Sequence, residues 1–552
     1  MPVIKVSLED LRALLGVAIT REEILEKVPM LGCDVSALDG EELAIEFFPN
    51  RPDLYSTEGV ARALRAFLGM RPGLQKYKPA RSGIAIDVDP SVEGVRKYIA
   101  ACAVTGVRLT ERILQGLIEV QEDLHWALGR GRRKVAIGVH DPAAVKPPYR
   151  YTTSLPKDTR FVPLGMAEEL TLEEVLQRHP KGVEYGPTLA GMERYPVILD
   201  ADGRVLSMPP IINGELTKVT PAAEELFIEV TGTDEASVNR AMNILATACA
   251  ERGWEIGTVE VRYPGRRVET PDLGPAKMKL RLAYLQKTLG AAIGPEEVAR
   301  ALERMGFGCR AMGDALEVLV PSYRTDILHE IDLVEDAAIG YGYGRLTEVL
   351  PPIPTVGGEE PMEHLCEDLR GLMLGYGFTE VMTLLLTNPE DNSRRLGLDE
   401  TSIEVRNPIS EEHTILRTNL FQGLLGVLRL NKHRELPLRV FEVGDVVLPV
   451  DVAETGAMGV RRLGACAMHP RANFTEAKSF AQGLLRDLGL EYGLTRYDYP
   501  PFIPGRCASV LAGGKVLGYF GELHPRVLTA FGLEYPVVAL EVDLEILISK
   551  PA

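Results

Sequence analysis

Four acidic side chains near residue 330 have the residue type and spacing to bind a hard cation. If residues 324–346, RTDILHEIDLVEDAAIGYGYGRL, form a helix, then Asp332, Glu335 and Asp336 share one face at i, i+3 and i+4. Like charges at that spacing cost a helix roughly 0.2–0.5 kcal/mol per pair. Asp326 lies just upstream and could complete a set of oxygen ligands for an octahedral Mg2+ that keeps several waters. A solvated acidic face near a helix N-terminus is the alternative, and spacing alone leaves both open.

Two short basic islands interrupt a chain whose formal net charge is −17. That charge argues against a protein that binds nucleic acid through a broad cationic surface. Each island is either a solvated patch or a local RNA contact that depends on another subunit for most of the interface. The islands contain Arg130, Arg132, Arg133 and Lys134 in GRGRRK, and Lys432, His433, Arg434 and Arg439 in NKHRELPLR.

Several kinds of site are disfavoured by the sequence. The seven cysteines are scattered without a C-x-x-C pair, which favours neither a disulfide framework nor a zinc ribbon. Neither a G-x-G-x-x-G nor a G-x-x-x-x-G-K-[ST] phosphate loop is present. No apolar run approaches the roughly 18 residues of a membrane span, and the N-terminus lacks the apolar core of a signal peptide. We therefore expect a cytoplasmic protein without membrane contact.

Proline- and glycine-rich stretches at residues 69–83, 262–275 and 350–361 divide the chain into four predicted blocks. The fold class predicted from them is α+β multidomain, with direct hairpins favouring antiparallel sheets. The blocks are a small α/β domain at residues 1–75, a strand-rich domain at 78–264, a winged-helix-like module at 270–347 and a block of helices and antiparallel strands at 360–552.

Local signals predict several elements within these blocks. SLEDLRALLG predicts an N-terminal helix, and Asp202-Gly203 and Gly513-Gly514 each predict a hairpin turn. DEASVNRAMNILATACAERG predicts a long helix with Val238, Met242, Leu245 and Cys249 on its buried face. In the acidic stretch, the predicted buried face consists of Ile327, Ile331, Val334 and Ala338.

Six stretches, in order along the chain, resemble the beta subunit of phenylalanyl-tRNA synthetase, in particular its archaeal or eukaryotic form. They are FFPNRPDLYSTEGVARAL, HPKGVEYG, PPIINGELTKVTPAAEELFIEVTGTD, VPSYRTDILHEIDLVEDAAIGYGYGRL, NPISEEHTILRTNLFQGLLGVLRLNKH and LRVFEVGDV. The resemblance covers nearly the whole chain, which has no room for the additional OB-like and anticodon-binding domains of the bacterial form. In this family the pattern D-x5-D-x2-E-[ED] binds Mg2+, which implies a structural ion held by Asp326, Asp332, Glu335 and Asp336 near a subunit contact.

The second block resembles the family's editing domain, which hydrolyses tyrosyl-tRNA made in error. The resemblance implies a pocket containing Asn213, Glu215 and Asp234, with Asp234 as the hydrogen-bond partner of the tyrosine phenol. The residues alone favour Asp234 or Thr233 as an N-cap of the helix that follows, and the cap and the pocket role can coexist. Gly214 stands where many relatives are expected to have serine. No nucleophile with a partnered base is evident, so a positioned water is the expected attacking group.

The fourth block resembles a class II synthetase catalytic domain that has lost its chemistry. Its RVFE, residues 439–442, is similar to the Arg-x-x-Glu that grips ATP, but the glycine-rich third motif is absent. The resemblance implies an (αβ)2 heterotetramer with an alpha subunit that binds ATP and phenylalanine and charges tRNA(Phe). The rival hypotheses are a structural, tRNA-binding partner subunit without editing activity, and a free-standing hydrolase of RNA-linked amino acids.

Overall fold

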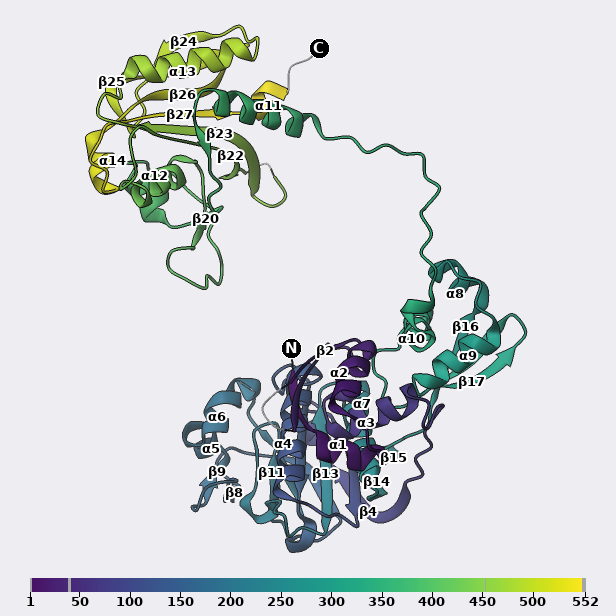
Figure 1. Cartoon of the computed structure of the whole chain (residues 1–552). Helices are drawn as coiled ribbons and strands as arrows, with labels where there is room; N and C mark the ends of the chain where they lie inside the picture. Colours follow the sequence, from purple (N-terminus) through teal and green to yellow (C-terminus); the bar gives the residue numbers. More distant parts are fainter. Residues whose placement is uncertain (1, 38–40, 452, 549–552) are drawn as a thin grey trace. The chain divides into compact units, whose positions relative to one another are not determined.

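The computed structural model describes residues 2–37, 41–451 and 453–548, which form two units (Figure 1). The units are Met1–Leu350 and Pro351–Ala552, and their division falls in the third proline-rich stretch. Each contains its own sheets and its own apolar core. The coarse prediction of an α+β multidomain chain is therefore confirmed.

The N-terminal part of the first unit is a small sheet with helices. Its strand order is β1-β3-β2, with both pairs antiparallel. The predicted first helix is present: Ser7 caps its start, and Gly16 ends it in the left-handed conformation at φ 73°. The elements are β1 (Val3–Ser7), α1 (Leu8–Leu15), α2 (Arg21–Lys27), β2 (Cys33–Ala37), β3 (Glu42–Phe47) and α3 (Thr57–Phe67).

A ten-stranded mixed sheet dominates the described part of the first unit, in the order β12-β11-β10-β7-β4-β14-β5-β13-β6, with β15 paired to β14. Only the pairs of β4 with β14 and with β7 are parallel. The predicted hairpin turn at Gly203 joins β10 to β11. The strands are β4 (Ala80–Val88), β5 (Tyr98–Thr105), β6 (Val135–His140), β7 (Tyr149–Ser154), β10 (Tyr195–Leu199), β11 (Val205–Met208), β12 (Ile212–Asn213), β13 (Glu225–Gly232), β14 (Glu255–Tyr263) and β15 (Arg266–Thr270).

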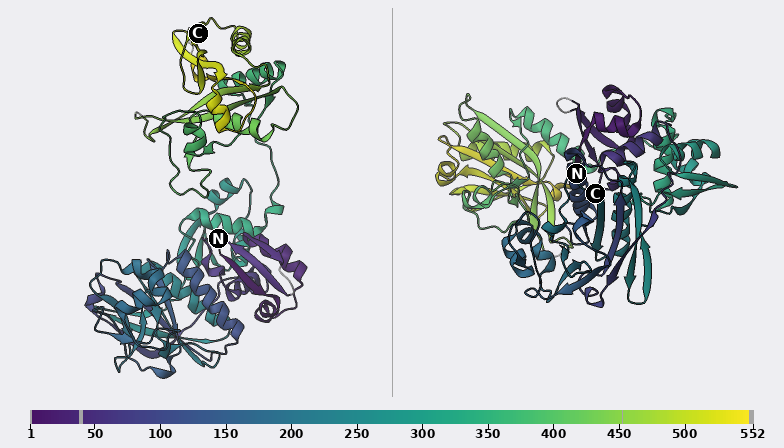
Figure 2. Two further views of the ribbon diagram at one scale, coloured as in Figure 1. Left: turned by 90° about the vertical axis from the view of Figure 1, so that its left-hand side faces the viewer. Right: turned by 90° about the horizontal axis from the view of Figure 1, so that it is seen from below.

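Two long helices, α4 (Glu111–Ala127) and α7 (Glu235–Glu251), pack on this sheet, and their apolar faces join one core with the N-terminal part. All four residues predicted for the buried face of α7 are buried. Figure 2 shows the purple N-terminal part lying against the blue sheet domain. Ion pairs of Arg252 with Asp10 and of Arg65 with Glu251 join the two parts. A smaller flap carries β8 (Arg160–Phe161), β9 (Leu170–Thr171), α5 (Leu172–Arg178) and α6 (Pro180–Tyr185).

The last part of the first unit is a three-stranded antiparallel sheet with helices packed against it. The acidic helix spans only Glu330–Tyr341, so the prediction of a helix over residues 324–346 is wrong for its first six residues and also extends too far at its end. Ile331, predicted to be buried, is 42% exposed. Gly340 is required because a Cβ there would lie 2.0 Å from the carbonyl oxygen of Ala301. The elements are β16 (Ala276–Arg281), α8 (Leu282–Leu289), α9 (Pro295–Arg304), β17 (Gly308–Met312), β18 (Ala315–Val320) and α10 (Glu330–Tyr341).

The second unit is built on a seven-stranded sheet in the order β19-β22-β23-β27-β26-β25-β24. All its described pairs are antiparallel except β19 with β22. The strands are β19 (Thr379–Glu380), β22 (Leu438–Pro449), β23 (Ala457–Met468), β24 (Gly493–Arg496), β25 (Phe502–Ala512), β26 (Lys515–Leu523) and β27 (Val537–Asp543). Around them lie α11 (Pro361–Gly375), the hairpin β20 (Leu386–Thr387) and β21 (Ile415–Leu416), α12 (Phe421–Leu430), α13 (Phe474–Asp487), α14 (Pro525–Ala530) and α15 (Glu545–Ile548).

Among the described residues, no helix combines the length and apolar character that crossing a membrane requires.

Candidate functional site

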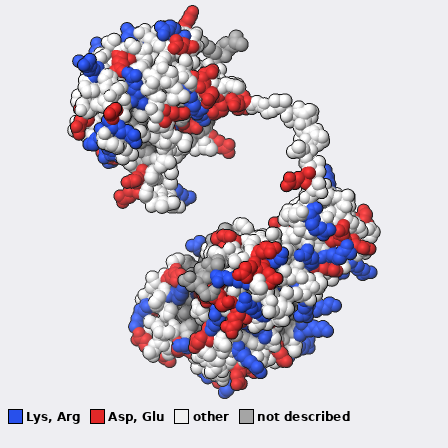
Figure 3. Space-filling view, viewed as in Figure 1, with Lys and Arg blue, Asp and Glu red and all other residues white. Residues whose placement is uncertain are grey.

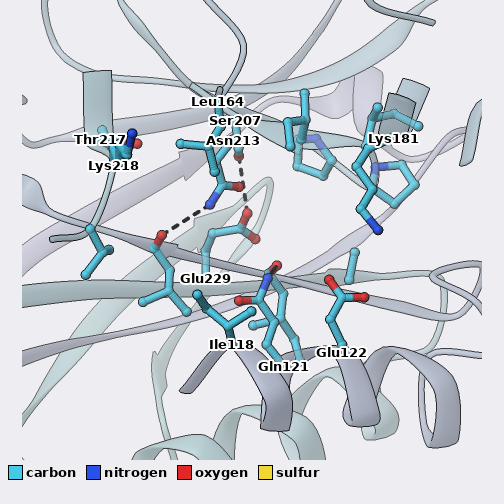
Figure 4. A pocket seen from close by; sticks show the side chains of 18 of the residues that line it. Ile118, Gln121, Glu122, Leu164, Lys181, Ser207, Asn213, Thr217, Lys218 and Glu229 are labelled. Atoms are coloured by element: carbon cyan, nitrogen blue, oxygen red, sulfur yellow. Dashed lines mark hydrogen bonds between the residues drawn. The ribbon is translucent and has the colours of Figure 1, made fainter. Parts of the chain in front are cut away.

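A cavity of about 450 Å3 lies in the first unit between α4, α6 and strands β6, β11, β12 and β13 of the large sheet (Figure 4). This volume is in the range of pockets that bind small molecules. Apolar side chains form most of its wall, and a few polar groups converge on it. The polar and charged lining residues are Gln121, Glu122, Arg132, Lys181, Ser207, Asn213, Thr217, Lys218 and Glu229.

Glu229 is the most deeply buried carboxylate of this cavity, with only 2% of its surface exposed. Its Oε1 accepts a hydrogen bond from the Ser207 hydroxyl at 3.2 Å, while Oε2 has no partner among the described residues. His140, fully buried, lies beside it with Nε2 3.9 Å from Oε1 and also unpartnered. Buried polar atoms of this kind are costly unless a ligand or water satisfies them. The cavity therefore presents a ready acceptor for a hydroxyl or amino group.

The pairing of β13 with β6 determines where this carboxylate lies. Glu229 stands directly opposite Gly138, and Phe227 opposite His140. A Cβ on residue 138 would lie 2.4 Å from Oε1 of Glu229 and 2.8 Å from Nε2 of His140. The glycine therefore leaves the space in which the carboxylate and the imidazole approach each other. On the other edge of the ring, Nδ1 of His140 is 2.7 Å from the Thr217 hydroxyl.

Arg132 forms a charged part of the wall. Its guanidinium donates to Glu122 at 2.7 Å and to the carbonyl of Ile211 at 2.9 Å, and it stacks on Tyr185 at 4.1 Å. The backbone at Arg130, Gly131 and Arg132 is left-handed, a conformation that non-glycine residues adopt rarely. The turn thereby directs Arg132 inward. Arg132 is buried in the cavity wall, so it is not part of a solvated basic patch, and the RNA contact predicted for it stays a prediction.

Glu122 is held in its ionised form beside this arginine. The interaction with His125, together with the charge of Arg132, lowers the pKa of Glu122 to about 2. His125 is itself buried, which lowers its pKa to about 4, and its Nε2 accepts a hydrogen bond from the backbone N–H of Ile137 at 2.8 Å. The imidazole is therefore neutral at physiological pH, and Glu122 presents one fixed negative charge at the cavity.

Of the three residues predicted for the editing pocket, one lines this cavity and a second lies beside it. Asn213 lines it and donates its amide to the carbonyl of Val139 at 3.1 Å. Glu215 is just outside, where it accepts from the backbone N–H of Gly165 at 2.7 Å and so holds a loop of the wall. Gly214 is explained by packing, since a Cβ there would lie 2.9 Å from the carbonyl oxygen of Val205. A serine at this position would require the neighbouring strand to shift.

Asp234 is not among the residues that line this cavity, and the editing role predicted for it stays a prediction. Its Oδ1 accepts from the backbone N–H of Ser237 at 2.8 Å, which makes it the N-cap of α7. It also lies 3.5 Å from Nζ of Lys134. These contacts lower the pKa of Asp234, the hydrogen bonds from Ser237 most of all. The N-cap role, which the sequence also predicted, explains why an aspartate stands at the start of α7.

The remaining basic residues have separate environments. Arg130 and Arg133 are exposed, and Lys134 is half-buried beside Asp234. In the second unit Lys432 pairs loosely with Glu534, and Arg434 donates to Asn431. On the faces visible in Figure 3, acidic and basic side chains are interspersed. The RNA contacts predicted for Arg130, Arg133 and Lys134 remain predictions.

The acidic cluster surrounds an arginine. Arg324 is buried and donates to Asp326 at 2.6 and 2.9 Å and to Asp336 at 2.5 and 3.2 Å. Burial alone would lower the pKa of Arg324, but the charges of Asp336 and Asp326 raise it well above its ordinary value. A permanent internal cation therefore compensates two of the four acids, and this explains part of the crowding that the sequence shows.

The other two acids have different roles. Asp332 accepts from the backbone N–H groups of Leu328 and His329, both at 2.7 Å, at the start of α10. Glu335 is exposed and forms no ion pair with the described residues; burial of its carboxyl and the charges of Asp336, Asp326 and Asp332 raise its pKa. Within the described ranges, no three His, Cys, Asp or Glu side chains are placed to hold one metal ion. The four acids thus do not fit a site in which all are direct ligands.

In the second unit, the RVFE residues are engaged internally. Arg439 contacts Glu476 at 3.3 Å, and Glu476 also contacts His469 at 2.7 Å. Glu442 forms a buried pair with Arg417 at 2.8 Å and accepts from the Thr383 hydroxyl. Both side chains of the motif therefore have protein partners.

Sequence reasoning missed Glu229 and Ser207, which line the cavity, and the buried His140, which lies beside Glu229. One signal was available: in the strand ELFIEVTG, Glu229 is an acid between the apolar residues Ile228 and Val230. An acid inside a buried strand is rarely tolerated unless it has a partner or a function.

Comparison with known proteins completes this picture. Residues 278–343 match the model of the tRNA synthetase B5 domain, and residues 346–544 match that of the phenylalanyl tRNA synthetase beta chain CLM domain. The chain is 45% identical to the phenylalanine–tRNA ligase beta subunits of Methanothrix thermoacetophila, over 99% of this chain and 100% of that one, and of Archaeoglobus fulgidus, over 99% and 98%.

A solved structure supports the same relationship. The crystal structure of an N-terminal fragment of the phenylalanyl-tRNA synthetase beta subunit from Pyrococcus horikoshii is 39% identical, with a TM-score of 0.60. The match covers 62% of this chain and all of that fragment. Because identities above 40% extend over essentially the whole length of both proteins, the chain belongs to the family of phenylalanine–tRNA ligase beta subunits.

Proposed function

We propose that this chain acts as the beta subunit of a ligase that joins phenylalanine to tRNA(Phe). The full-length identity to beta subunits carries this assignment. The alpha subunit of the proposed (αβ)2 heterotetramer binds ATP and phenylalanine, and the complex acts in the cytoplasm. The second unit contributes no ATP chemistry in this proposal, because Arg439 and Glu442 are engaged with protein partners.

Within that complex, the cavity around Glu229 hydrolyses tyrosyl-tRNA(Phe). The observation that carries this proposal is the unpartnered Oε2 of Glu229 inside a largely apolar cavity of about 450 Å3. The aromatic ring of tyrosine packs against the apolar wall, and its phenol hydroxyl donates a hydrogen bond to Glu229. Phenylalanine would leave the buried carboxylate unpaired, which costs roughly 1–3 kcal/mol or more for a charged group. Correctly charged tRNA is thereby rejected.

The chemical step is attack of water on the ester that joins tyrosine to the tRNA. The ester C–O bond breaks, the tyrosine carboxylate forms, and the ribose oxygen leaves with a proton. With the phenol anchored at Glu229, the ester lies toward the charged residues Lys181, Arg132 and Glu122. Binding energy from the remote phenol thus orients the reacting ester.

The test is to mix the complex of this chain and its alpha subunit with preformed tyrosyl-tRNA and phenylalanyl-tRNA. Rapid release of tyrosine with phenylalanine retained supports editing. Absence of release from a complex that still charges tRNA(Phe) would instead favour the structural, tRNA-binding subunit, whereas a chain that hydrolyses both esters and does not associate with an alpha subunit would favour the free-standing hydrolase.

Replacing Asp234 with alanine is expected to lower stability by about 1 kcal/mol without affecting tyrosyl-tRNA hydrolysis, because the side chain caps α7. Urea unfolding and the hydrolysis assay check the two parts. Asp234→Asn, which preserves an acceptor for the cap, is the matched control. Loss of hydrolysis in a folded Asp234→Ala protein would return this residue to the pocket.

The alpha subunit docks on an exposed apolar segment of the second unit. Four of the five residues in 382–386 are exposed apolar side chains, and Met382 is 95% exposed. Ile409, in the loop between β20 and β21, is also fully exposed. Large exposed apolar groups of this kind mark interaction surfaces. A beta subunit has an alpha partner by definition, and this partner is the proposed occupant.

The double variant Met382→Asp/Leu384→Asp is expected to weaken association with the alpha subunit by roughly 30-fold or more, as for interface hot spots. Copurification and sedimentation measure the association. Met458→Asp, at another exposed apolar position of the same unit, is the control. Unchanged association of the double variant would place the interface elsewhere.

Magnesium binding stays a proposal, with Glu335 as the one direct protein ligand. Because Asp326, Asp336 and Asp332 are engaged, a hydrated Mg2+ would contact the exposed Glu335 directly and reach the others through water. Mg2+ commonly uses only one or two carboxylates in this way. Burial and the nearby charges of Asp336, Asp326 and Asp332 raise the pKa of Glu335. A bound cation would offset this repulsion between carboxylates, which gives the ion a structural role.

Millimolar Mg2+ is expected to raise the unfolding temperature of the full chain by a few degrees, as expected for a ligand that binds only the folded state. Glu335→Gln should remove this increase, whereas Glu296→Gln, at an exposed acid of α9, should preserve it. Calorimetry measures both. An equal Mg2+ effect in the Glu335→Gln protein would contradict the proposed ligand.

A further inference from the structure

A second cavity, of about 480 Å3, lies in the first unit where α7 and the end of β15 meet β16 and the loop that precedes α10. None of the residues predicted for editing or for metal binding lines it. The lining residues that matter here are Tyr98, Asn239, Arg240, Asn243, Lys277 and Ser322.

Asn243 brings an unsatisfied acceptor to this cavity. The side chain is 8% exposed, and its Nδ2 donates to the carbonyl of Asp272 at 2.9 Å. That bond determines the orientation of the amide, since a carbonyl can only accept. Oδ1 then has no hydrogen-bond partner among the described residues. A buried acceptor left unpaired is destabilising, and a bound donor would remove that cost.

Ser322 supplies a second unpartnered group from a different segment of the chain. Its Oγ is buried and, within the described residues, without a hydrogen bond. A hydroxyl can donate or accept, so it complements either kind of ligand atom. The cavity therefore offers one acceptor and one adaptable hydroxyl to the same ligand, with an apolar wall that includes Val238, Met278 and Ile327.

The charge available at the rim is positive. Arg240 is exposed and forms no ion pair with any described residue, and Lys277 is 68% exposed at 3.3 Å from Glu317. Three acids in the lining are already engaged: Glu235 with Arg266 at 2.7 Å, Glu269 with Arg81 at 2.7 Å, and Asp272 with the backbone N–H of Gly274 at 3.0 Å. An anionic group would thus find Arg240 unpaired, and of these three acids only Asp272 lacks a cationic partner among the described residues.

An adjoining cavity of about 320 Å3 extends this site, and the two share Tyr98, Tyr263 and Glu235. Cations lie over both aromatic rings, Lys97 over Tyr98 at 5.8 Å and Arg266 over Tyr263 at 4.6 Å. Aromatic faces, cations and unpaired amide or hydroxyl groups in one groove are the combination with which proteins bind unpaired nucleotides.

We infer that these joined cavities bind a nucleotide. The base enters the cavity lined by Asn243, where a ring or exocyclic N–H donates to Oδ1 and a base acceptor receives the Ser322 hydroxyl. The phosphate lies at Arg240. The same chemistry is offered by a free mononucleotide and by an unpaired nucleotide of bound tRNA. Only the tRNA source rests on the proposed function.

The test uses the complex of the full chain with its alpha subunit and the variants Arg240→Ala and Ser322→Ala. Arg300→Ala, at an exposed arginine of α9 that lines neither cavity, is the control. Calorimetry measures binding of the four nucleoside 5′-monophosphates, and filter binding measures uncharged tRNA(Phe) over a range of salt. Arg240→Ala is expected to weaken binding roughly fivefold to tenfold and to reduce the salt slope for tRNA by about one. Ser322→Ala is expected to weaken binding roughly fivefold with the slope unchanged.

The outcomes separate the sources and the hypotheses. Mononucleotide binding that the two variants weaken supports a site for free nucleotides. Weakened tRNA binding without mononucleotide binding supports an unpaired nucleotide of the RNA. If no mononucleotide binds and neither variant alters tRNA affinity, the inference is overturned. Tyrosyl-tRNA hydrolysis by the same preparations then shows whether the proposed function stands without it.

Discussion

Replacing Glu229 with leucine is expected to abolish the preference of the complex for tyrosyl-tRNA over phenylalanyl-tRNA, a change of roughly 100-fold or more in the ratio of hydrolysis rates. The reason is the unpartnered Oε2 of this buried carboxylate, the acceptor proposed for the phenol. With an apolar side chain in its place, the cavity distinguishes the two amino acids only by the fit of one hydroxyl group. Timed release of each labelled amino acid measures the ratio.

Two further variants make this result specific. Glu225→Leu changes the same residue type at the exposed start of the same strand, and it should leave the ratio unchanged. Glu229→Gln preserves shape but replaces the charged acceptor with a neutral one, so an intermediate ratio is expected. If Glu229→Leu, with a wild-type unfolding midpoint, still favoured tyrosyl-tRNA, the phenol would have to be recognised by another residue.

Replacing Arg324 with methionine is expected to lower the free energy of unfolding by roughly 3–5 kcal/mol, because one buried cation serves two acids. Asp336 is 4% exposed, and Asp326 is also largely enclosed, so neither carboxylate can recover full hydration. The stacking of the guanidinium over Phe307 at 4.8 Å is lost as well. The shift of the urea midpoint measures the effect.

Two further variants distinguish loss of charge pairing from loss of packing as the cause of the lower stability. Arg345→Met removes an arginine that is 57% exposed and pairs with Glu297, and it should cost less than about 1 kcal/mol. Adding Asp336→Asn to Arg324→Met removes one of the stranded charges and should recover part of the loss. No recovery in the double variant would show that packing, and not charge, explains the cost.

Much of the local structure was predictable from short-range signals. Ser7 caps the start of α1 and Gly16 caps its end, and the apolar spacing of α7 matches its buried face. The start of α10 was not predictable in this way. Arg324 and Asp326 are held outside the helix by their buried ion pair, and Asp332 caps the chain at His329. Tertiary contacts here override a helical periodicity that continues upstream.

The candidate site was likewise only partly predictable from the sequence. The resemblance directed attention to the segment that contains Asn213 and Glu215, and the structure places both at or beside the cavity. It also directed attention to Asp234, which is only a few residues from Glu229 along the chain but belongs to a helix N-terminus. Proximity in sequence does not decide which acid faces a cavity, because strand pairing and helix entry point neighbouring residues in different directions.

The sequence by itself determined the α+β class, the helices and hairpins with strong local signals, and the family, since these depend on residue order and short-range physics. Only the tertiary structure decided that Glu229 faces His140 across Gly138 and that Arg324 lies among the crowded acids. The physical reason is that both arrangements join residues from separate elements. The register of β13 on β6 and the packing around Arg324 emerge only when the whole core has formed.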